Sequence, residues 1–319
     1  MPHPPAAAAA ALRHGNNNAA TTKTSSRGHG GDESALLAFK EKISGHSGGI
    51  TCNRRYPQRV LGLELSSQGL TGTISPAIGN LTFLSSLNLS YNTLQGEIPP
   101  SIGCLGRLEI LDLSVNVLTG VIPSNISRCT SLSLMSIFSN KGVQGRIPAE
   151  IGSMPLLSVL VLDNNSITGT IPSSLRNLSQ LAFLSLEANY LEGSIPSIGN
   201  NPYLLFLQIS DNNLSGCLLS PSLYNLSSLF LLLLSENILS GRIPSSIGNL
   251  ANLRVLDLGE NSLTGVIPES IGNLTRLKNL HLDSNNLSGR IPPSIGNQLT
   301  SLQVLNARGN SLKGPIISE

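Results

Sequence analysis

A repeat of about 24 residues runs through most of the chain, and it constrains the fold more than any other feature of the sequence. One column of the repeat carries an asparagine in ten successive copies, and Gln68 holds the same place in the copy before them. A glycine follows four residues later in nearly every copy. Because the copies keep one register, the sequence predicts a stack of similar coils. The asparagines are Asn92, Asn116, Asn140, Asn165, Asn189, Asn212, Asn237, Asn261, Asn285 and Asn310.

Most copies contain leucines spaced LxxLxL, as in the segment 84–99. This spacing puts the last two leucines on one face of a short strand, because side chains alternate at period two. A coil with one buried face is not stable alone, so the coils must stack and pair their strands in parallel. We therefore expect an α/β solenoid whose eleven strands form a sheet roughly 50 Å long. The asparagine amides are expected to hydrogen bond backbone groups at the turn after each strand, which is a structural role.

A recurring Ile-Pro pair, as at Ile98-Pro99, ends a second extended segment in most copies. Proline has no N–H to donate and belongs at an edge or a turn. A short helical or irregular stretch is expected to return the chain to the next strand.

Charge, cysteines and motifs argue against several classes of function. The net charge is +2, which indicates no nucleic-acid partner, and the arginines Arg54, Arg55 and Arg59 are interpreted as a solvated edge. Four cysteines allow three pairings, but none has metal-ligand spacing, so isolated thiols are the favoured interpretation. No set of catalytic residues, cofactor motif or membrane-length apolar run is found, so we expect neither an enzyme nor a direct membrane segment.

The pattern LxxLxLxxNxLxGxIP, with the phrase Ser-Ile-Gly-Asn-Leu, resembles the plant class of leucine-rich repeat. The stretch Ser34–Lys40 resembles the N-terminal cap helix of plant leucine-rich-repeat receptor kinases, and the segment 70–103 is most similar to their pathogen-recognising subfamily. The resemblance implies a right-handed superhelix with the parallel sheet on its concave face. It also implies an ectodomain at the extracellular face of the plasma membrane, in defence or development signalling. Its partners would be a peptide or protein ligand and a co-receptor.

Three segments are expected: a disordered leader (1–31), an incomplete N-terminal cap (32–59) and the repeats (60–319). The cap has no tryptophan and a single cysteine, Cys52, and no convincing signal peptide precedes it. We therefore expect a truncated receptor product. Two alternatives stay open: a secreted enzyme inhibitor similar to plant polygalacturonase-inhibiting proteins, and a non-functional receptor fragment.

The positions beside the strand leucines are polar in most copies but apolar in the seventh and eighth. An apolar patch on a polar face predicts a binding site, although sideways packing between coils is an equal alternative. His281, close to Asp283, is interpreted as a plain solvated residue, with a proton-sensitive contact as the alternative. The candidate ligand-binding residues are Phe183, Glu187, Leu205, Phe206, Gln208, Phe230, Leu231, Leu233, Asp257 and His281.

Nine N-x-S/T sequons avoid the asparagine column and fit a secreted, glycosylated chain. Several come from one repeated phrase, so they are not independent observations. They are Asn80, Asn88, Asn125, Asn164, Asn177, Asn213, Asn225, Asn273 and Asn286.

Overall fold

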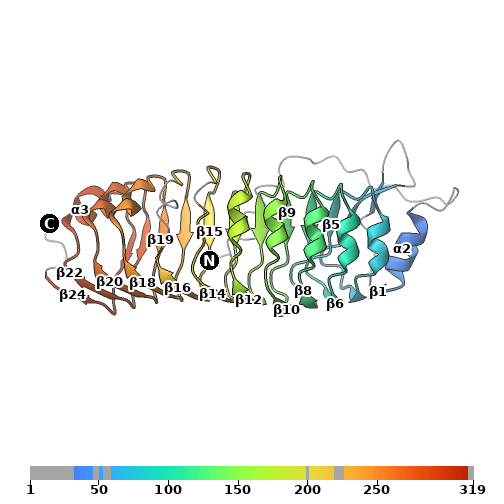
Figure 1. The fold of residues 1–319 in the computed structure, drawn as a ribbon, viewed down its shortest axis with the longest axis horizontal. Coiled ribbons are helices and arrows are strands. Elements are labelled where there is room, and N and C mark those ends of the chain that lie inside the picture. The colour runs from blue at the N-terminus through green and yellow to red at the C-terminus, as the bar shows by residue number, and fades with distance from the viewer. Residues whose placement is uncertain (1–31, 46–49, 53–58, 199–200, 219–225, 315–319) are drawn as a thin grey trace. The chain divides into compact units, whose positions relative to one another are not determined.

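The computed structural model describes residues 32–45, 50–52, 59–198, 201–218 and 226–314 (Figure 1). The chain forms two compact units, Met1–Val143 and Gln144–Glu319, each of which is described by itself. In both units every repeat contributes one strand to a first sheet and one strand to a second sheet. The predicted coil-by-coil fold with a parallel sheet is therefore confirmed.

The first unit starts with helix α2 (Glu33–Lys40), which lies beside the first coils (Figure 1). Its first sheet has the order β2-β3-β5-β7-β9 and its second sheet the order β1-β4-β6-β8. Strands β1 and β2 pair antiparallel with their neighbours, and the strands that follow pair in parallel. The bounds are β1 Ile43–Ser44, β2 Ile50–Cys52, β3 Val60–Glu64, β4 Thr71–Thr73, β5 Ser86–Asn88, β6 Thr93–Glu97, β7 Ile110–Asp112, β8 Val117–Val121 and β9 Leu134–Ser136, with 3-10 helices η2 Pro76–Asn80, η3 Pro100–Cys104 and η4 Ser124–Arg128.

Helix α2 is tied to the first strand through Asp32, which is fully buried. The Asp32 carboxylate accepts a hydrogen bond from the Val60 amide at 2.7 Å and pairs with Arg59 at 3.0 Å. The Arg59 guanidinium also lies 4.8 Å from the centre of the Phe83 ring. The interpretation of Arg59 as a solvated edge residue was therefore wrong, because it neutralises a buried carboxylate. Arg54 and Arg55 lie outside the described residues.

In the second unit, the first sheet has the order β11-β13-β15-β17-β19-β21-β23 and the second sheet the order β12-β14-β16-β18-β20-β22-β24. Strand β10 (Gly142–Gly145) contains the boundary between the units. The first-sheet bounds are β11 Val159–Val161, β13 Phe183–Ser185, β15 Phe206–Gln208, β17 Leu231–Leu233, β19 Val255–Asp257, β21 Asn279–His281 and β23 Val304–Asn306. The second-sheet bounds are β12 Ser166–Thr170, β14 Tyr190–Gly193, β16 Asn213–Cys217, β18 Ile238–Arg242, β20 Ser262–Val266, β22 Asn286–Gly289 and β24 Ser311–Leu312. The connecting helices are η5 Ala149–Ser153, η6 Ser173–Asn177, η8 Ser245–Asn249, η9 Glu269–Asn273 and α3 Pro293–Gln298.

The core lies between the two sheets of each unit and is built almost entirely from leucine and isoleucine. The paired strand leucines, such as Leu256 and Leu258, are fully buried, as period-two alternation predicts. The segments before the Ile-Pro pairs were expected only to be extended. They form the second parallel sheet, in which Thr168 pairs with Tyr190 and Thr264 with Asn286.

The asparagine column links each coil to the one before it. The Asn237 amide group donates to the carbonyls of Ile209, Leu234 and Ser235, and its oxygen accepts from the Leu214 amide. Asn92, Asn116, Asn189, Asn212, Asn261, Asn285 and Asn310 repeat this arrangement. These backbone groups lie inside the turn, so the asparagine supplies the partners that a neighbouring strand does not.

Candidate ligand-binding site

A row of neighbouring side chains in contact crosses the outer face of the first sheet in the second unit. The ring centres of Phe183 and Phe206 are 5.2 Å apart, and those of Phe206 and Phe230 are 5.6 Å apart. The Arg254 guanidinium lies 4.7 Å from the centre of the Phe230 ring. Adjacent strands of a sheet lie about 4.8 Å apart, so Phe183 and Phe206, which pair in register, reach contact distance without distortion. The register partner of Phe206 in the next coil is Leu231, so Phe230 lies one residue earlier, at the place that Arg254 holds in its own coil.

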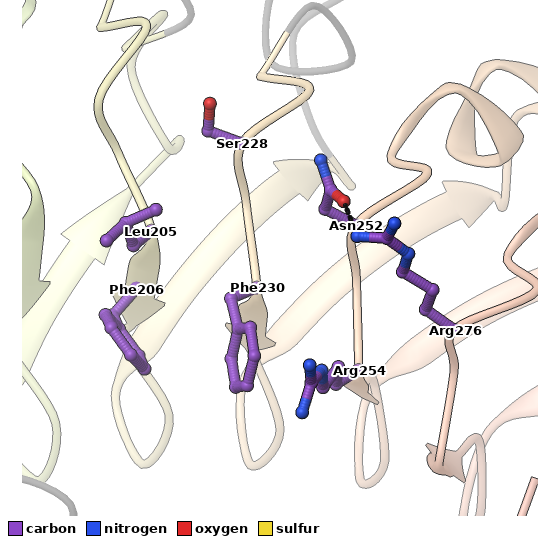
Figure 2. Close-up of a pocket in the computed structure, with 7 residues that line it drawn as sticks. All are labelled: Leu205, Phe206, Ser228, Phe230, Asn252, Arg254 and Arg276. Atoms are coloured by element: carbon purple, nitrogen blue, oxygen red, sulfur yellow. Dashed lines mark hydrogen bonds between the residues drawn. The ribbon is translucent and has the colours of Figure 1, made fainter. Parts of the chain in front are cut away.

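The row borders a cavity of about 320 Å³ at the start of the first-sheet strands (Figure 2). Phe206 and Phe230 form one side of the cavity and Arg254 lies next to them, while Arg276 reaches toward Asn252. An Arg276 N–H donates to the Asn252 side-chain oxygen. Leu205 and Ser228 complete the lining. The cavity thus combines ring faces, an aliphatic side chain and two guanidinium groups.

The candidate ligand-binding residues do not all lie where the alternation placed them. Leu205, Phe206 and Phe230 line the cavity, and Leu231 and Leu233 are half-buried on the same face. Phe183 was expected to be open to a ligand, but it is only 3% exposed, with the tilted ring of Phe206 packed against it. Gln208 is 2% exposed and donates to the Glu187 carboxylate. Alternation predicts the face of a side chain but not the extent to which the next coil covers it.

Acidic side chains gather at the opposite ends of the same strands. Burial raises the pKa of Glu236, and the charges of Asp211, Glu260, Glu187 and Asp257 raise it further. Asp257 is in register with His281 on the next strand. Asp283, the expected partner of His281, lies 3.9 Å from Arg308 in an ion pair. The face therefore carries arginines at the strand starts and carboxylates at the strand ends.

The sequence interpretation missed Ser228, Asn252, Arg254 and Arg276. An apolar patch selected this part of the face, and these four side chains are polar. Arg254 holds the same place in its coil as Phe230 in the preceding coil, both coming directly after a strand leucine. An arginine and an aromatic residue at the same place in neighbouring coils is the signal that would have identified Arg254.

The sequon asparagines differ in exposure. Asn80, Asn125, Asn177, Asn213, Asn273 and Asn286 are exposed, Asn164 is half-buried, and Asn225 lies outside the described residues. Asn88 is only 7% exposed, and its side-chain oxygen accepts hydrogen bonds from the amide and hydroxyl of Ser90. Every sequon asparagine is expected at the surface, and Asn88 is therefore an exception.

The described residues contain three free cysteines, and their environments differ. Cys129 is buried and donates to the Ile102 carbonyl at 3.2 Å, and burial raises the pKa of its thiol to about 11. Cys104 and Cys217 are exposed. Within the described ranges, no three His, Cys, Asp or Glu side chains gather as the ligands of a metal ion would. The helices in that part of the chain are all too short or too polar to cross a bilayer.

Comparison with known proteins shows the family to which these repeats belong. A model of a leucine-rich repeat region matches residues 185–315, and the single leucine-rich repeat model matches residues 83–105, 107–129 and 156–178. The receptor kinase-like protein Xa21 of Oryza sativa subsp. japonica is 42% identical over 20% of this chain and 8% of its own length. The receptor-like kinase EFR of Arabidopsis thaliana is 43% identical over 18% of this chain and 7% of its own length. The chain thus matches only a small part of these relatives.

Solved structures extend the likeness to most of the chain. The Arabidopsis receptor kinase HAESA, in complex with the peptide hormone IDA and the co-receptor SERK1, has a TM-score of 0.80 at 33% identity, covering 89% of this chain and 50% of that one. The ectodomain of the Arabidopsis receptor kinase GASSHO1/SCHENGEN3, in complex with CASPARIAN STRIP INTEGRITY FACTOR 2, has a TM-score of 0.73 at 35% identity, covering 85% and 35%. The shared fold is a non-catalytic ectodomain fold.

Proposed function

We propose that this chain, which belongs to the leucine-rich-repeat proteins and is homologous to plant receptor-kinase ectodomains, recognises a peptide or protein ligand on the first sheet of its second unit. The observation that supports this most is the row of Phe206, Phe230 and Arg254 beside a cavity. Aromatic and arginine side chains supply most of the binding energy at protein interfaces. The role in signalling, with a co-receptor at the cell surface in defence or development, belongs to the same proposal.

The fold supports this function because it holds the row before any ligand arrives. Phe206 lies in a strand that pairs on both sides, and Phe230 and Arg254 directly precede such strands. A rigid face loses little conformational freedom when a ligand binds, so more of the contact energy appears as affinity. HAESA shows a related ectodomain in complex with a peptide hormone.

The test is a selection of linear peptides from a display library on the intact chain. The peptides that bind are then measured against Phe230→Ser and Leu233→Ser. We expect each substitution to weaken binding by about 2 kcal/mol or more, because it removes apolar area from the proposed binding face. Ile110→Ser is the matched control, since Ile110 is an exposed first-sheet residue of the other unit. Unchanged binding by both second-unit variants would show that the ligand binds elsewhere.

The extracellular part of the proposal has its own measurement. If the chain passes through the secretory pathway, the exposed sequons accept glycans, whereas Asn88 does not, because its side chain is buried in the fold. Peptide mapping of protein from plant cells, before and after deglycosylation, reports occupancy at each site. A chain without any glycan would remove this support for an extracellular location.

A further inference from the structure

Four polar side chains meet on the outer face of the first sheet, near the ends of β11, β13 and β15. Ser185 and Gln208 are the last residues of β13 and β15, and they pair in register. Asp163 and Glu187 come two residues after the ends of β11 and β13, and an Asp163 carboxylate oxygen accepts from the Glu187 amide at 2.9 Å. The Gln208 side-chain amide donates to the Glu187 carboxylate. These four residues are called the oxygen cluster below.

Three oxygen atoms of the oxygen cluster are buried and have no hydrogen-bond partner within the described part of the chain. They are Oδ2 of Asp163, Oγ of Ser185 and Oε1 of Gln208. Ser185 is fully buried, Gln208 is 2% exposed and Asp163 is 5% exposed, so bulk solvent does not satisfy them. Leaving a buried polar atom without a partner costs free energy, and three such atoms at one place point to a shared partner.

The corresponding places in the first unit form their own hydrogen bonds. The Ser90 hydroxyl donates to the Asn88 side-chain oxygen at 2.7 Å, and the hydroxyl oxygens of Ser114 and Ser136 are 2.7 Å apart. None of these four described residues has a buried side-chain oxygen without a partner. The ends of first-sheet strands therefore do not leave oxygens unsatisfied as a rule, and the oxygen cluster is a special place in the repeat.

The chemistry of the three oxygens favours a positive partner. An ionised carboxylate and an amide oxygen only accept hydrogen bonds, and a serine hydroxyl has a single proton to donate. Burial raises the pKa of Asp163 to about 7, and the Glu187 charge adds to the rise, so a proton on Asp163 is one such partner. A proton joins only two of the oxygens, whereas a cation contacts all three and also offsets the repulsion between the two carboxylates.

The kinds of ligand atom and their surroundings favour Ca²⁺ among the cations. Carboxylate, hydroxyl and amide oxygens suit a hard cation, and Ca²⁺ accepts six to eight oxygens in flexible geometry, with water filling the remaining positions. Glu187 is half-buried, which gives an ion a path from solvent. The charges of Asp211, Glu260 and Glu187 all raise the pKa of Glu236, so negative charge surrounds that path and attracts cations.

We propose that the oxygen cluster binds one Ca²⁺ ion through the carboxylates of Asp163 and Glu187, the Ser185 hydroxyl and the Gln208 side-chain oxygen. The ion takes the place of the proton on Asp163. Its ligands come from three successive coils, so the bound ion fastens these coils together directly beside Phe183 and Phe206, which lie two residues earlier on the same strands. This inference does not depend on the proposed peptide-binding function.

The experiment titrates Ca²⁺ into the intact chain by calorimetry, after treatment with a chelator. It is done at about pH 8 and about 0.1 M salt, which screens diffuse surface charge. We expect one ion per chain with a Kd of about 0.1–1 mM, the range of extracellular sites with few charged ligands. Asp163→Asn and Glu187→Gln should each weaken binding at least tenfold, because each removes a charged ligand without changing the size of the side chain. Thermal unfolding gives a second readout: Ca²⁺ should raise the Tm of the wild type but not that of Asp163→Asn.

The matched controls are Asp211→Asn and Glu260→Gln. Each removes one charge from an exposed acidic side chain outside the oxygen cluster, and each should keep the Kd within about threefold. Controls that weaken binding as much as Asp163→Asn would show that surface charge collects the ion, and would overturn the proposal. A wild-type chain that binds no Ca²⁺ at about 10 mM, or that binds Mg²⁺ as tightly, would overturn it as well. Loss of binding confined to the oxygen cluster variants would support it.

Discussion

Asp163 is a buried carboxylate at the end of strand β11, where the chain enters the turn before Asn165. Burial raises its pKa to about 7, and the nearby Glu187 charge adds to the rise, although the nearby Ser185 hydroxyl and a hydrogen bond from the Glu187 amide oppose it. One of its oxygens accepts from that amide at 2.9 Å. An Asp in an unfolded chain titrates near 3.9, so the folded protein holds a proton that the unfolded chain has lost over this interval.

The first prediction follows from this difference. Stability rises with pH where the unfolded state binds more protons, and here the folded state binds more. Asp163 therefore lowers the free energy of unfolding as pH rises from about 4 to about 7, and adds no further change above that. Asp163→Asn should remove this slope and raise stability at pH 8, by at most about 4 kcal/mol. Urea unfolding of both proteins at several pH values measures it, and parallel profiles would contradict the assignment.

Val115 has a left-handed backbone with φ of 53°, as does the residue before the column asparagine in most coils. The left-handed region costs an L-residue roughly 1–2 kcal/mol, and it is least suited to a β-branched one. Asn164 holds the same place in another coil with φ of 52°. Val115→Asn should therefore stabilise the protein by about 1 kcal/mol, since asparagine tolerates this conformation. Thermal unfolding measures the gain, and Val117→Asn, at an exposed strand position, is the control that should give none.

At the scale of the elements, the 3-10 helices of successive coils approach one another through glycine. A Cβ atom built on Gly103, in η3, would lie 2.2 Å from the Asn125 carbonyl oxygen in η4. Other coils repeat the contact, as at Gly79 and Gly152. The glycines of the Ile-Gly phrase are therefore needed for the spacing of the coils and not only for turns.

The third prediction tests this spacing. Gly103→Ala should destabilise the first unit by roughly 1–3 kcal/mol, because the new methyl group forces the two helices apart. Gly106→Ala is the matched control three residues away, where a Cβ atom would have no neighbour within 4 Å. The midpoint of urea unfolding is measured for both variants. The two values show the effect of the same added methyl group at a closely packed position and at an open one. Equal midpoints would show that the coils do not pack through Gly103.

The sequence predicted the strands well because their signal is local: the strand leucines alternate, and the turn asparagine follows at a fixed interval. It did not predict the second sheet, whose pairing joins residues such as Gly241 and Leu263 from different coils. It also placed Phe183 in the open, because the ring that covers it belongs to the next coil. The errors thus concern contacts between coils, which the pattern within one coil does not contain.

At the scale of the whole molecule, the hydrogen bonds of a column asparagine such as Asn237 join its own coil to the one before. Those of Asn237 end at Ile209 and Leu214 on one side and at Leu234 and Ser235 on the other. Stability in such an array is close to a sum of terms between nearest neighbours. Damage at one asparagine should therefore remain local.

The last prediction measures how far a defect spreads. Asn237→Ala leaves the Leu214 amide of β16, and two carbonyls in the turn between β17 and β18, without partners, at a cost of about 1–3 kcal/mol. Amide hydrogen exchange should accelerate in these strands, whereas β12 and β22, each two coils away, should keep their protection. Asn249→Ala, at an exposed asparagine of η8, should change neither region. A uniform acceleration through the second unit would mean that its coils unfold as one cooperative body, and the candidate site could then be destabilised from any of them.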